Sequence, residues 1–350
     1  MSSPPAKLPS PAGRPGVTTS SSPPRGPPSR HSASSPIEPE APIEVDSNET
    51  DADSAIEDRL SAYTASLSSS VVDYPVEHGR RYHAFRSGVY AMPNDDAEMD
   101  RLDLTHAMMV KALDNHLFLS PIEEDKLRRV LDVGTGTGIW AMEFADMYPQ
   151  AEVLGNDLSP IQPAWVPPNL KFEVDDAESE WAHDDFSFIF CRYMFACIAD
   201  WPKLVSNVYD HLETGGWAEF QDYDLMYVSE DGTLTDEHYT RKWIKTLLNL
   251  SDKTGREPCP GPKLENWLRG AGFQNVHAEK YRFPVGPWPK DPKLKGVGML
   301  NLRQALDGLE AFSLRLFCDV GKWTEQEVTV LLANVRKELK DPSIHMQFHL

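Results

Sequence analysis

Three glycines at every second position, Gly134, Gly136 and Gly138, follow directly after the apolar run Val130 to Val133. A short apolar run of this kind is typical of a buried parallel strand. Glycine lets the chain turn tightly after such a strand and brings bare backbone close to a ligand. Helical sequence then begins at Ile139. We therefore predict a strand, a turn and a helix that together hold a nucleotide-like ligand.

The spacing of these glycines bears on the kind of nucleotide. The chain has the pattern G-x-G-x-G, whereas the dinucleotide fingerprint is usually G-x-G-x-x-G. The pattern therefore favours S-adenosylmethionine over NAD. Glycines after a strand also form ordinary turns, so a purely structural interpretation stays open at this point.

An acidic residue stands where a ribose-binding carboxylate is expected. Asp157 ends the segment Ala151 to Asp157, whose centre is apolar, and it follows the glycines by about 20 residues, the usual distance in dinucleotide-binding proteins. A carboxylate at the end of the second strand can accept hydrogen bonds from ribose hydroxyls. Asp157 is also suited to begin a turn with Ser159 and Pro160.

Two further predicted strands end in polar residues. Lys171 to Val174 is followed by Asp175, Asp176 and Ala177, and Phe186 to Cys191 is followed by Arg192. The carboxyl ends of parallel strands meet at one edge of a sheet, so we expect a single site there. A carboxylate after the third strand suits the amino group of adenine, which S-adenosylmethionine and NAD share.

The order of these motifs resembles that of the class I S-adenosylmethionine-dependent methyltransferases, with VLDVGTGTG, VLGNDLSP, VDDAE, FSFIFCRYMF and GGWAEFQDYD in succession. More narrowly, the segments Tyr82 to His106 and Phe283 to Asp291, with CRYMFACIADW between them, are similar to the fungal LaeA-type methyltransferases. The resemblance extends from about Tyr82 to Leu350.

The resemblance implies a cofactor site made of Asp132, Gly134, Thr135, Gly136, Gly138, Asp157, Asp176, Ala177 and Arg192. Asp132 and the glycine-rich loop would hold the methionine portion of S-adenosylmethionine. Arg192 would line the same end, although an arginine there could equally form a structural ion pair.

The resemblance also implies which residues bind the nucleoside end of the cofactor. Asp157 would bind the ribose hydroxyls, and Asp176 with the backbone of Ala177 would bind the amino edge of adenine. Asp175 is the rival to Asp176, because a shift of one residue in the turn exchanges the two.

The resemblance also implies an α/β fold with a seven-stranded, mostly parallel, doubly wound (Rossmann-like) sheet and helices on both faces. Its last three strands would be Trp217 to Asp222, Phe273 to Phe283 and an antiparallel Ser343 to Leu350. Family members typically continue a few residues further, so we expect this last strand to be frayed. The expected parts are a tail at 1–60 and a methyltransferase domain at 61–350, divided into a helical cap at 61–128, a cofactor-binding core at 129–284, a helical insertion at 285–342 and the last strand at 343–350.

The first 60 residues differ from the rest in composition. They hold 12 of the 29 prolines, many serines and no aromatic residue. Such a segment cannot bury enough apolar surface to fold, so we predict a disordered tail. Four Ser-Pro pairs, at Ser3, Ser10, Ser22 and Ser35, also suit phosphorylation and the recruitment of protein partners.

Composition excludes several classes of function. The net charge of −20 argues against nucleic acid as a partner. The four cysteines show neither zinc-site nor disulfide spacing, so we expect no metal and a reducing compartment. His345 and His349, on one strand, would lie too far apart to share a metal ion. We expect no signal peptide, no membrane partner and a cytoplasmic location, with the nucleus as the alternative.

Methyl transfer depends mainly on positioning, and a general base is needed only when the acceptor is a hydroxyl. His106, Tyr193 and Glu219 are candidate bases, and the sequence does not choose among them. Tyr82 and Tyr90 are expected near the substrate together with His106. The insertion is expected to form a lid or substrate wall with the aromatic side chains of Tyr281, Phe283, Trp288, Phe312 and Phe317.

Two classes of function remain. One is a methyltransferase that acts on an oxygen or nitrogen atom of a small molecule in fungal secondary metabolism. The other is a LaeA-like nuclear regulator that acts through protein partners. A NAD-dependent oxidoreductase on the same kind of sheet is a third and weaker hypothesis.

Overall fold

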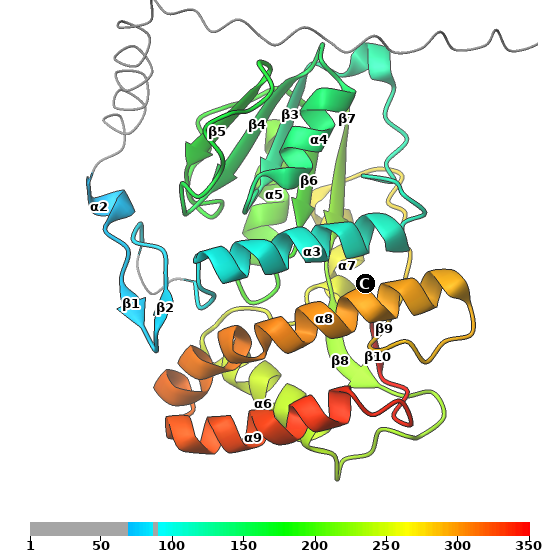
Figure 1. Ribbon diagram of the computed structural model, residues 1–350. Helices are drawn as coiled ribbons and strands as arrows, with labels where there is room; N and C mark the ends of the chain where they lie inside the picture. The colour runs from blue at the N-terminus through cyan, green and yellow to red at the C-terminus, as the bar shows by residue number, and fades with distance from the viewer. Residues whose placement is uncertain (1–68, 87–89) are drawn as a thin grey trace, which may run out of the picture. The chain divides into compact units, whose positions relative to one another are not determined.

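The computed structural model describes residues 69–86 and 90–350 (Figure 1). The predicted tail at 1–60 and its four Ser-Pro pairs lie outside the described residues, as does the beginning of the predicted cap. No helix among the described residues is long and apolar enough to cross a membrane.

Five parallel strands form the central sheet, in the order β5-β4-β3-β6-β7. The predicted strand-turn-helix units are present, and the chain order of the strands gives a doubly wound sheet. The inner strand β6, between β3 and β7, is apolar and almost fully buried because both of its faces are covered. The strands are β3 (Arg129–Val133), β4 (Glu152–Asp157), β5 (Leu170–Val174), β6 (Phe186–Arg192) and β7 (Leu212–Gln221).

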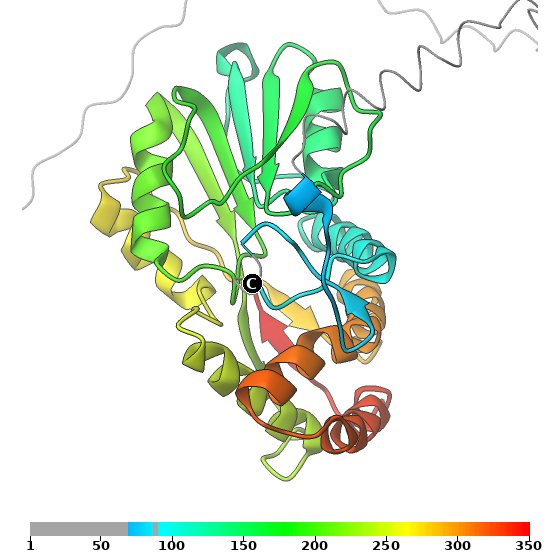
Figure 2. The ribbon, with the colours of Figure 1, turned by 90° about the vertical axis from the view of Figure 1, so that its left-hand side faces the viewer.

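Helices cover both faces of this sheet, and Figure 2 shows α4 and α5 on opposite sides of it. On one face, α4 (Ile139–Met147) packs its Trp140 ring on Phe190 of β6, with the ring centroids 4.0 Å apart. On the other face, α5 (Trp201–His211) and α7 (Gly261–Ala271) pack against Ile189 and its neighbours.

The predicted seven-stranded sheet is wrong. Described residues after β7 form a separate antiparallel sheet, in the order β8-β10-β9, instead of two further strands of the central one. Residues 274–281, most of the predicted sixth strand, are largely exposed and form no strand, because they lack the apolar side chains that would bury them. The strands are β8 (Asp224–Val228), β9 (Arg282–Pro284) and β10 (Gln347–His349).

The second core lies beneath this small sheet. Phe348 of β10 stacks with Phe283 and Tyr227, and helices of the predicted insertion close the core from the other side. This burial fixes the last strand here, away from the central sheet. The helices around this core are α3 (Asp96–Ala112), α6 (Tyr239–Lys253), α8 (Pro292–Arg315), the π-helical turn η2 (Leu316–Val320) and α9 (Glu325–Leu339).

Short elements complete the described chain. They are α2 (Ser69–Val72), β1 (Val76–Glu77), β2 (Arg80–Arg81) and the 3₁₀ turn η1 (Glu124–Lys126). The β1-β2 hairpin leads into the segment before α3. Helix α3 begins after Asp95, which accepts the backbone N–H of Glu98 as an N-cap. It ends before Asp114 and Asn115, which take left-handed backbone angles.

Helix α3 lies between the central sheet and α8 (Figure 1). Its buried Arg101 donates to Glu98, with Nη2 and Oε1 2.6 Å apart, and to Oε1 of Gln304 on α8 at 3.0 Å. The guanidinium also lies over the Phe312 ring of α8, 4.9 Å from its centroid. Arg101 therefore joins α3 to α8 inside the protein.

We expect Arg101→Leu to lower the free energy of unfolding by about 3–5 kcal/mol, because the carboxylate of Glu98 would stay buried without its partner. Urea denaturation measures this loss. The control is Arg303→Leu, which removes an exposed pair with Asp307 on α8 and should leave the free energy of unfolding almost unchanged. Equal losses for both variants would contradict the buried-charge explanation.

Candidate functional site

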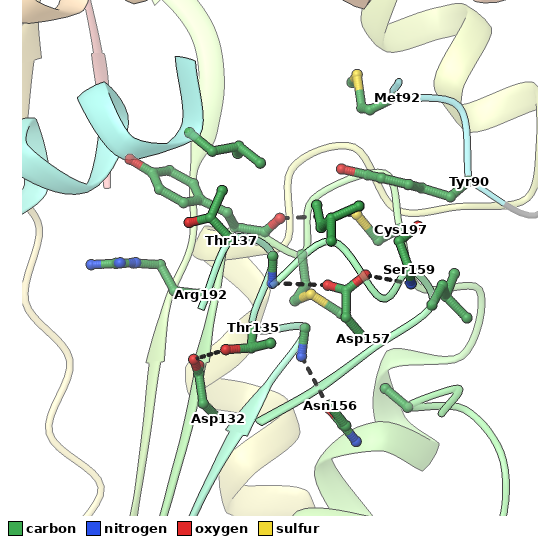
Figure 3. A pocket seen from close by; sticks show the side chains of 18 of the residues that line it. Tyr90, Met92, Asp132, Thr135, Thr137, Asn156, Asp157, Ser159, Arg192 and Cys197 are labelled. Carbon is green, nitrogen blue, oxygen red and sulfur yellow. Dashed lines mark hydrogen bonds between the residues drawn. The ribbon is translucent and has the colours of Figure 1, made fainter. Parts of the chain in front are cut away.

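One pocket lies where the carboxyl ends of β3, β4, β5 and β6 meet, as predicted from the strand order. Its volume is about 1210 Å³, including the part open to solvent, and it is covered by α3 and by the described residues of a covering segment, 83–86 and 90–94. Figure 3 shows its carboxylates and hydroxyls together with Arg192. The predicted cofactor residues that line it are Asp132, Gly134, Thr135, Gly136, Asp157, Asp176, Ala177 and Arg192.

The glycine-rich loop needs glycine for geometric reasons. Gly134, Gly136 and Gly138 all have positive φ angles, which other residues adopt at a cost. A Cβ atom on Gly134 would lie 2.5 Å from the sulfur of Met194. Gly138 does not line the pocket; a Cβ atom there would lie 2.4 Å from the Phe172 ring, so this glycine permits close packing at the start of α4.

Asp157 connects the glycine-rich loop to the end of β4. Gly136 donates its backbone N–H to Oδ2 at 2.9 Å, and Ser159 donates to Oδ1 at 3.0 Å. Asp157 thus begins the turn to Ser159 and also lines the pocket, where its contact with a ribose stays a prediction. Burial raises the pKa of Asp157 to about 6, although the backbone donors oppose the shift.

The backbone N–H groups of the glycine-rich loop are largely occupied. Gly134 donates to Oδ1 of Asn156, Thr135 donates to the Asn156 carbonyl, and Gly138 donates to the Thr135 carbonyl. With Gly136 bound to Asp157, four of the five N–H groups from 134 to 138 have partners in the protein. A pyrophosphate needs such donors free, so this loop is poorly suited to NAD.

Asp132 is buried beneath the loop. The hydroxyl of Thr135 donates to its Oδ2 at 2.5 Å. Burial raises the pKa of Asp132 to about 7, while Thr135 and the positive charge of Arg192 oppose that rise. The site therefore contains a carboxyl group that titrates near neutral pH.

Asp175 and Asp176 both line the pocket but have different partners. Asp175 accepts the backbone N–H of Asp176, at 2.8 Å. The buried carboxylate of Asp176 accepts the N–H of Glu178 at 2.9 Å and pairs with Arg86, whose Nη1 lies 2.7 Å from Oδ2. Asp176 thus reaches across to the covering segment, whereas Asp175 stabilises its own turn. The sequence analysis did not identify Arg86.

Arg192 lies at the other end of the pocket from Ser159 (Figure 3). Its Nη2 lies 2.8 Å from Nδ1 of His106 on α3. The alternative of a structural ion pair is not supported, since no carboxylate in the described part of the chain lies within 4.0 Å of its guanidinium.

The three candidate bases have different surroundings. Glu219 does not line the pocket, and its carboxylate accepts the backbone N–H groups of Leu119 and Ser120, so this candidate is wrong. Tyr193 lines the pocket and its hydroxyl accepts a hydrogen bond from Tyr223 at 2.6 Å. Burial raises the pKa of Tyr193. His106 lines the pocket with both ring nitrogens engaged.

The covering segment contributes side chains that the motifs did not single out. Tyr90 lines the pocket as expected, whereas Tyr82 is buried behind it against Arg315. His83 also lines the pocket. Its Nε2 lies 3.2 Å from the carbonyl of Arg86, so Nδ1 carries the lone pair, and Nδ1 is buried without a partner among the described residues. The only sequence signal for His83 was its place within the LaeA-like segment.

The predicted aromatic wall is wrong. None of its five residues lines the pocket, and neither does any residue of the insertion at 285–342. Most of them lie in the second core instead, because they face the small antiparallel sheet and α6 rather than the strand ends. The wrongly placed residues are Tyr281, Phe283, Trp288, Phe312 and Phe317.

The pocket's chemistry suits a nucleoside that carries a charged amino-acid end. Carboxylates at the ends of β4 and β5 can accept hydrogen bonds from hydroxyl and amino groups. Nη1 of Arg192 is buried without a hydrogen-bond partner among the described residues, so an anionic group would satisfy it. Between these polar ends the lining is apolar, with Leu102, Ile139 and Phe190.

Comparison with known proteins agrees with this chemistry. The family described as "Methyltransferase domain" matches residues 104–278. The chain is 44% identical to "Methyltransferase pytC" of Aspergillus terreus over 302 residues, which cover 86% of this chain and 93% of that relative. It is 37% identical to "Secondary metabolism regulator LAE1" of Cochliobolus heterostrophus (77% and 90% covered) and 33% identical to "Protein-methionine methyltransferase laeA" of Emericella nidulans (77% and 72% covered).

The raised pKa of Asp132 predicts a pH-dependent stability difference. Between pH 3.8 and about 7, the folded protein holds a proton that the unfolded chain has released, so this residue's contribution to stability falls as the pH rises. We expect Asp132→Asn to match the wild type near pH 4 and to be more stable at pH 8 by about 2–4 kcal/mol.

Urea denaturation at both pH values measures this difference. The control is Asp125→Asn, an exposed carboxylate in η1, which should leave the pH dependence unchanged. An Asp132→Asn variant that is no more stable than the wild type at pH 8 would contradict the effect of burial.

Proposed function

The chain belongs to the S-adenosylmethionine-dependent methyltransferases of the LaeA type, and from this premise we propose that it methylates an oxygen or nitrogen atom of a small molecule in fungal secondary metabolism. The observation that carries the proposal is the covered pocket at the strand ends. It joins carboxylates suited to a nucleoside with an unpaired guanidinium nitrogen suited to an anion.

We assign the cofactor contacts as the resemblance implies. Asp157 would hold the ribose, and Asp176 with Ala177 the adenine edge. Asp132, Arg192 and the loop from Gly134 to Gly138 would hold the methionine end, where Gly138 acts through packing. Asp175 is only partly buried, and its carboxylate accepts the backbone N–H of Asp176 within its own turn, so it is the weaker candidate for adenine.

S-adenosylmethionine, when bound, supplies a methyl group activated by a sulfonium. The protein's own part is to orient the acceptor and exclude water, which is the main requirement of such a transfer. The described residues of the covering segment, with Leu102 and His106 of α3, cover the strand ends and supply these walls. A covered pocket of this kind suits a small acceptor better than a folded protein surface.

A second candidate is a LaeA-like regulator, which the 37% identity to a secondary metabolism regulator supports. We favour the small-molecule enzyme because the chain is more similar to a relative named as a methyltransferase, over more of both chains. The enzyme would act in the cytoplasm, whereas the regulator would act in the nucleus with protein partners.

The direct test uses the purified full chain, methyl-labelled S-adenosylmethionine and an extract of the source organism. We expect a labelled small molecule, and none with the Asp157→Ala variant as a control. Label that appears only in proteins, with no labelled small product, would contradict the enzyme proposal and favour the regulator.

The cofactor assignment is tested through Asp157 itself. We expect Asp157→Ala to weaken S-adenosylhomocysteine binding about 10- to 150-fold, because hydrogen bonds to a charged group are lost. Calorimetry measures the dissociation constant. The control is Asp184→Ala, at the opposite end of β6, which should bind normally. An unchanged constant in a folded Asp157→Ala protein would show that the ribose site lies elsewhere.

A further inference from the structure

Three side chains from three elements form a hydrogen-bonded chain at one end of the pocket. Arg192 is the last residue of β6, His106 lies on α3, and Glu143 lies on α4. Nη2 of Arg192 lies 2.8 Å from Nδ1 of His106, and Nε2 of His106 lies 3.0 Å from Oε2 of Glu143.

The chemistry of the partners fixes the proton positions. A guanidinium has donors and no acceptor, so Nδ1 of His106 must carry the lone pair. The proton of the neutral ring then lies on Nε2, which donates to the carboxylate of Glu143. His106 is therefore fully engaged in the free protein and has no lone pair left for an acceptor's proton.

Burial keeps this arrangement in its neutral form. The side chain of His106 is 5% exposed, while that of Glu143 is 51% exposed. Burial lowers the pKa of His106, and the positive charge of Arg192 lowers it further. The carboxylates of Glu143 and Asp103 act in the opposite direction.

Arg192 needs a partner that the described residues do not supply. Its Nη1 is buried without a hydrogen bond. The rings of Phe190 and Tyr193 lie 5.5 and 5.6 Å from the guanidinium, and they offer only weak compensation for a buried cation. Because Arg192 lines the pocket, an anionic group of the bound ligand can reach it.

We propose that Glu143 and His106 position Arg192 to bind the carboxylate at the methionine end of the cofactor. This inference rests on the proposed function. His106 is then a positioning residue that acts through Arg192, and it is not the general base. Glu143 fixes the tautomer of His106, and His106 in turn fixes the orientation of the guanidinium.

The test compares two probes with the full-length protein. S-adenosylhomocysteine carries the amino-acid end, whereas 5′-methylthioadenosine has the same nucleoside and thioether without it. We expect His106→Leu to weaken S-adenosylhomocysteine binding about tenfold or more in calorimetry. Binding of 5′-methylthioadenosine should stay within about twofold, because it makes no contact with Arg192.

A conservative variant separates positioning from packing. His106→Asn keeps an acceptor oxygen near the place of Nδ1, so we expect it to recover most of the lost affinity. Glu143→Ala should weaken S-adenosylhomocysteine binding several-fold, and the control Asp146→Ala, also exposed on α4, should not.

The pH profile provides a further readout. Protonation of His106 would put an N–H on Nδ1 that faces the N–H of Arg192, and the hydrogen bond that positions Arg192 would be lost. The affinity of the wild type for S-adenosylhomocysteine should therefore fall as the pH drops through the lowered pKa of His106. Asp132 and Asp157 titrate in the same pocket. Both carboxyl groups are present in the wild type and in His106→Asn. The flatter pH profile of binding that we expect for His106→Asn therefore isolates the contribution of His106.

Several outcomes would overturn the proposal. One is an affinity of His106→Leu for S-adenosylhomocysteine equal to that of the wild type. Another is an equal loss of affinity for S-adenosylhomocysteine and 5′-methylthioadenosine. A third is nitrogen NMR of the ligand-free protein that places the His106 proton on Nδ1. Failure of the wild type to bind either probe would instead contradict the proposed function itself.

Discussion

The hydrogen bonds that the Asp157 carboxylate accepts from the backbone N–H groups of Gly136 and Ser159 are the interactions on which the rest of the site depends. They hold the turn between β3 and α4 against the end of β4 while the three glycines keep positive φ angles. With this turn in place, Asp132 lies beneath the loop and the carboxyl ends of four strands open into one pocket. The bond from Gly136 also occupies a loop donor that a pyrophosphate would need, so a structural requirement also disfavours that class of ligand.

This arrangement places charge where the protein excludes water. Burial raises the pKa values of Asp132 and Asp157 and also that of Asp222, which holds the turn after β6 through the N–H of Met194. Carboxyl groups in such positions reduce the stability of the free protein, and binding sites commonly retain them because the ligand uses them. Two arginines show the same contrast. Arg101 is buried and paired, so its role is structural, whereas Nη1 of Arg192 is buried without a hydrogen-bond partner among the described residues.

The sequence predicted those features that depend on neighbouring residues. Apolar runs followed by Gly, Asp or Arg located β3 to β6 and their shared edge, and eight of the nine cofactor residues line the pocket. Gly138 does not line the pocket, and a Cβ atom on it would meet the ring of Phe172, a contact between distant residues that the motif does not reveal. The predicted positions of the last two strands and of the aromatic wall were wrong because they too depend on contacts between distant residues. The sequence of a strand such as β10 does not name the strand it pairs with. That partner is decided by where Phe348 can be buried.

The position of the insertion changes which parts of the chain can determine the acceptor. Residues 285–342 do not reach the pocket, but α8 supports α3 through Gln304 and Phe312, and α3 presents Leu102 and His106 to it. Arg315 of the same insertion donates to the carbonyl of Tyr90 and stacks on Tyr82, so it holds the covering segment as well. The insertion therefore acts indirectly, by setting the positions of α3 and of the described residues of the covering segment. Differences in acceptor among related proteins should accordingly arise from the side chains of those two covering elements, while changes in the insertion alter how firmly the cover is held.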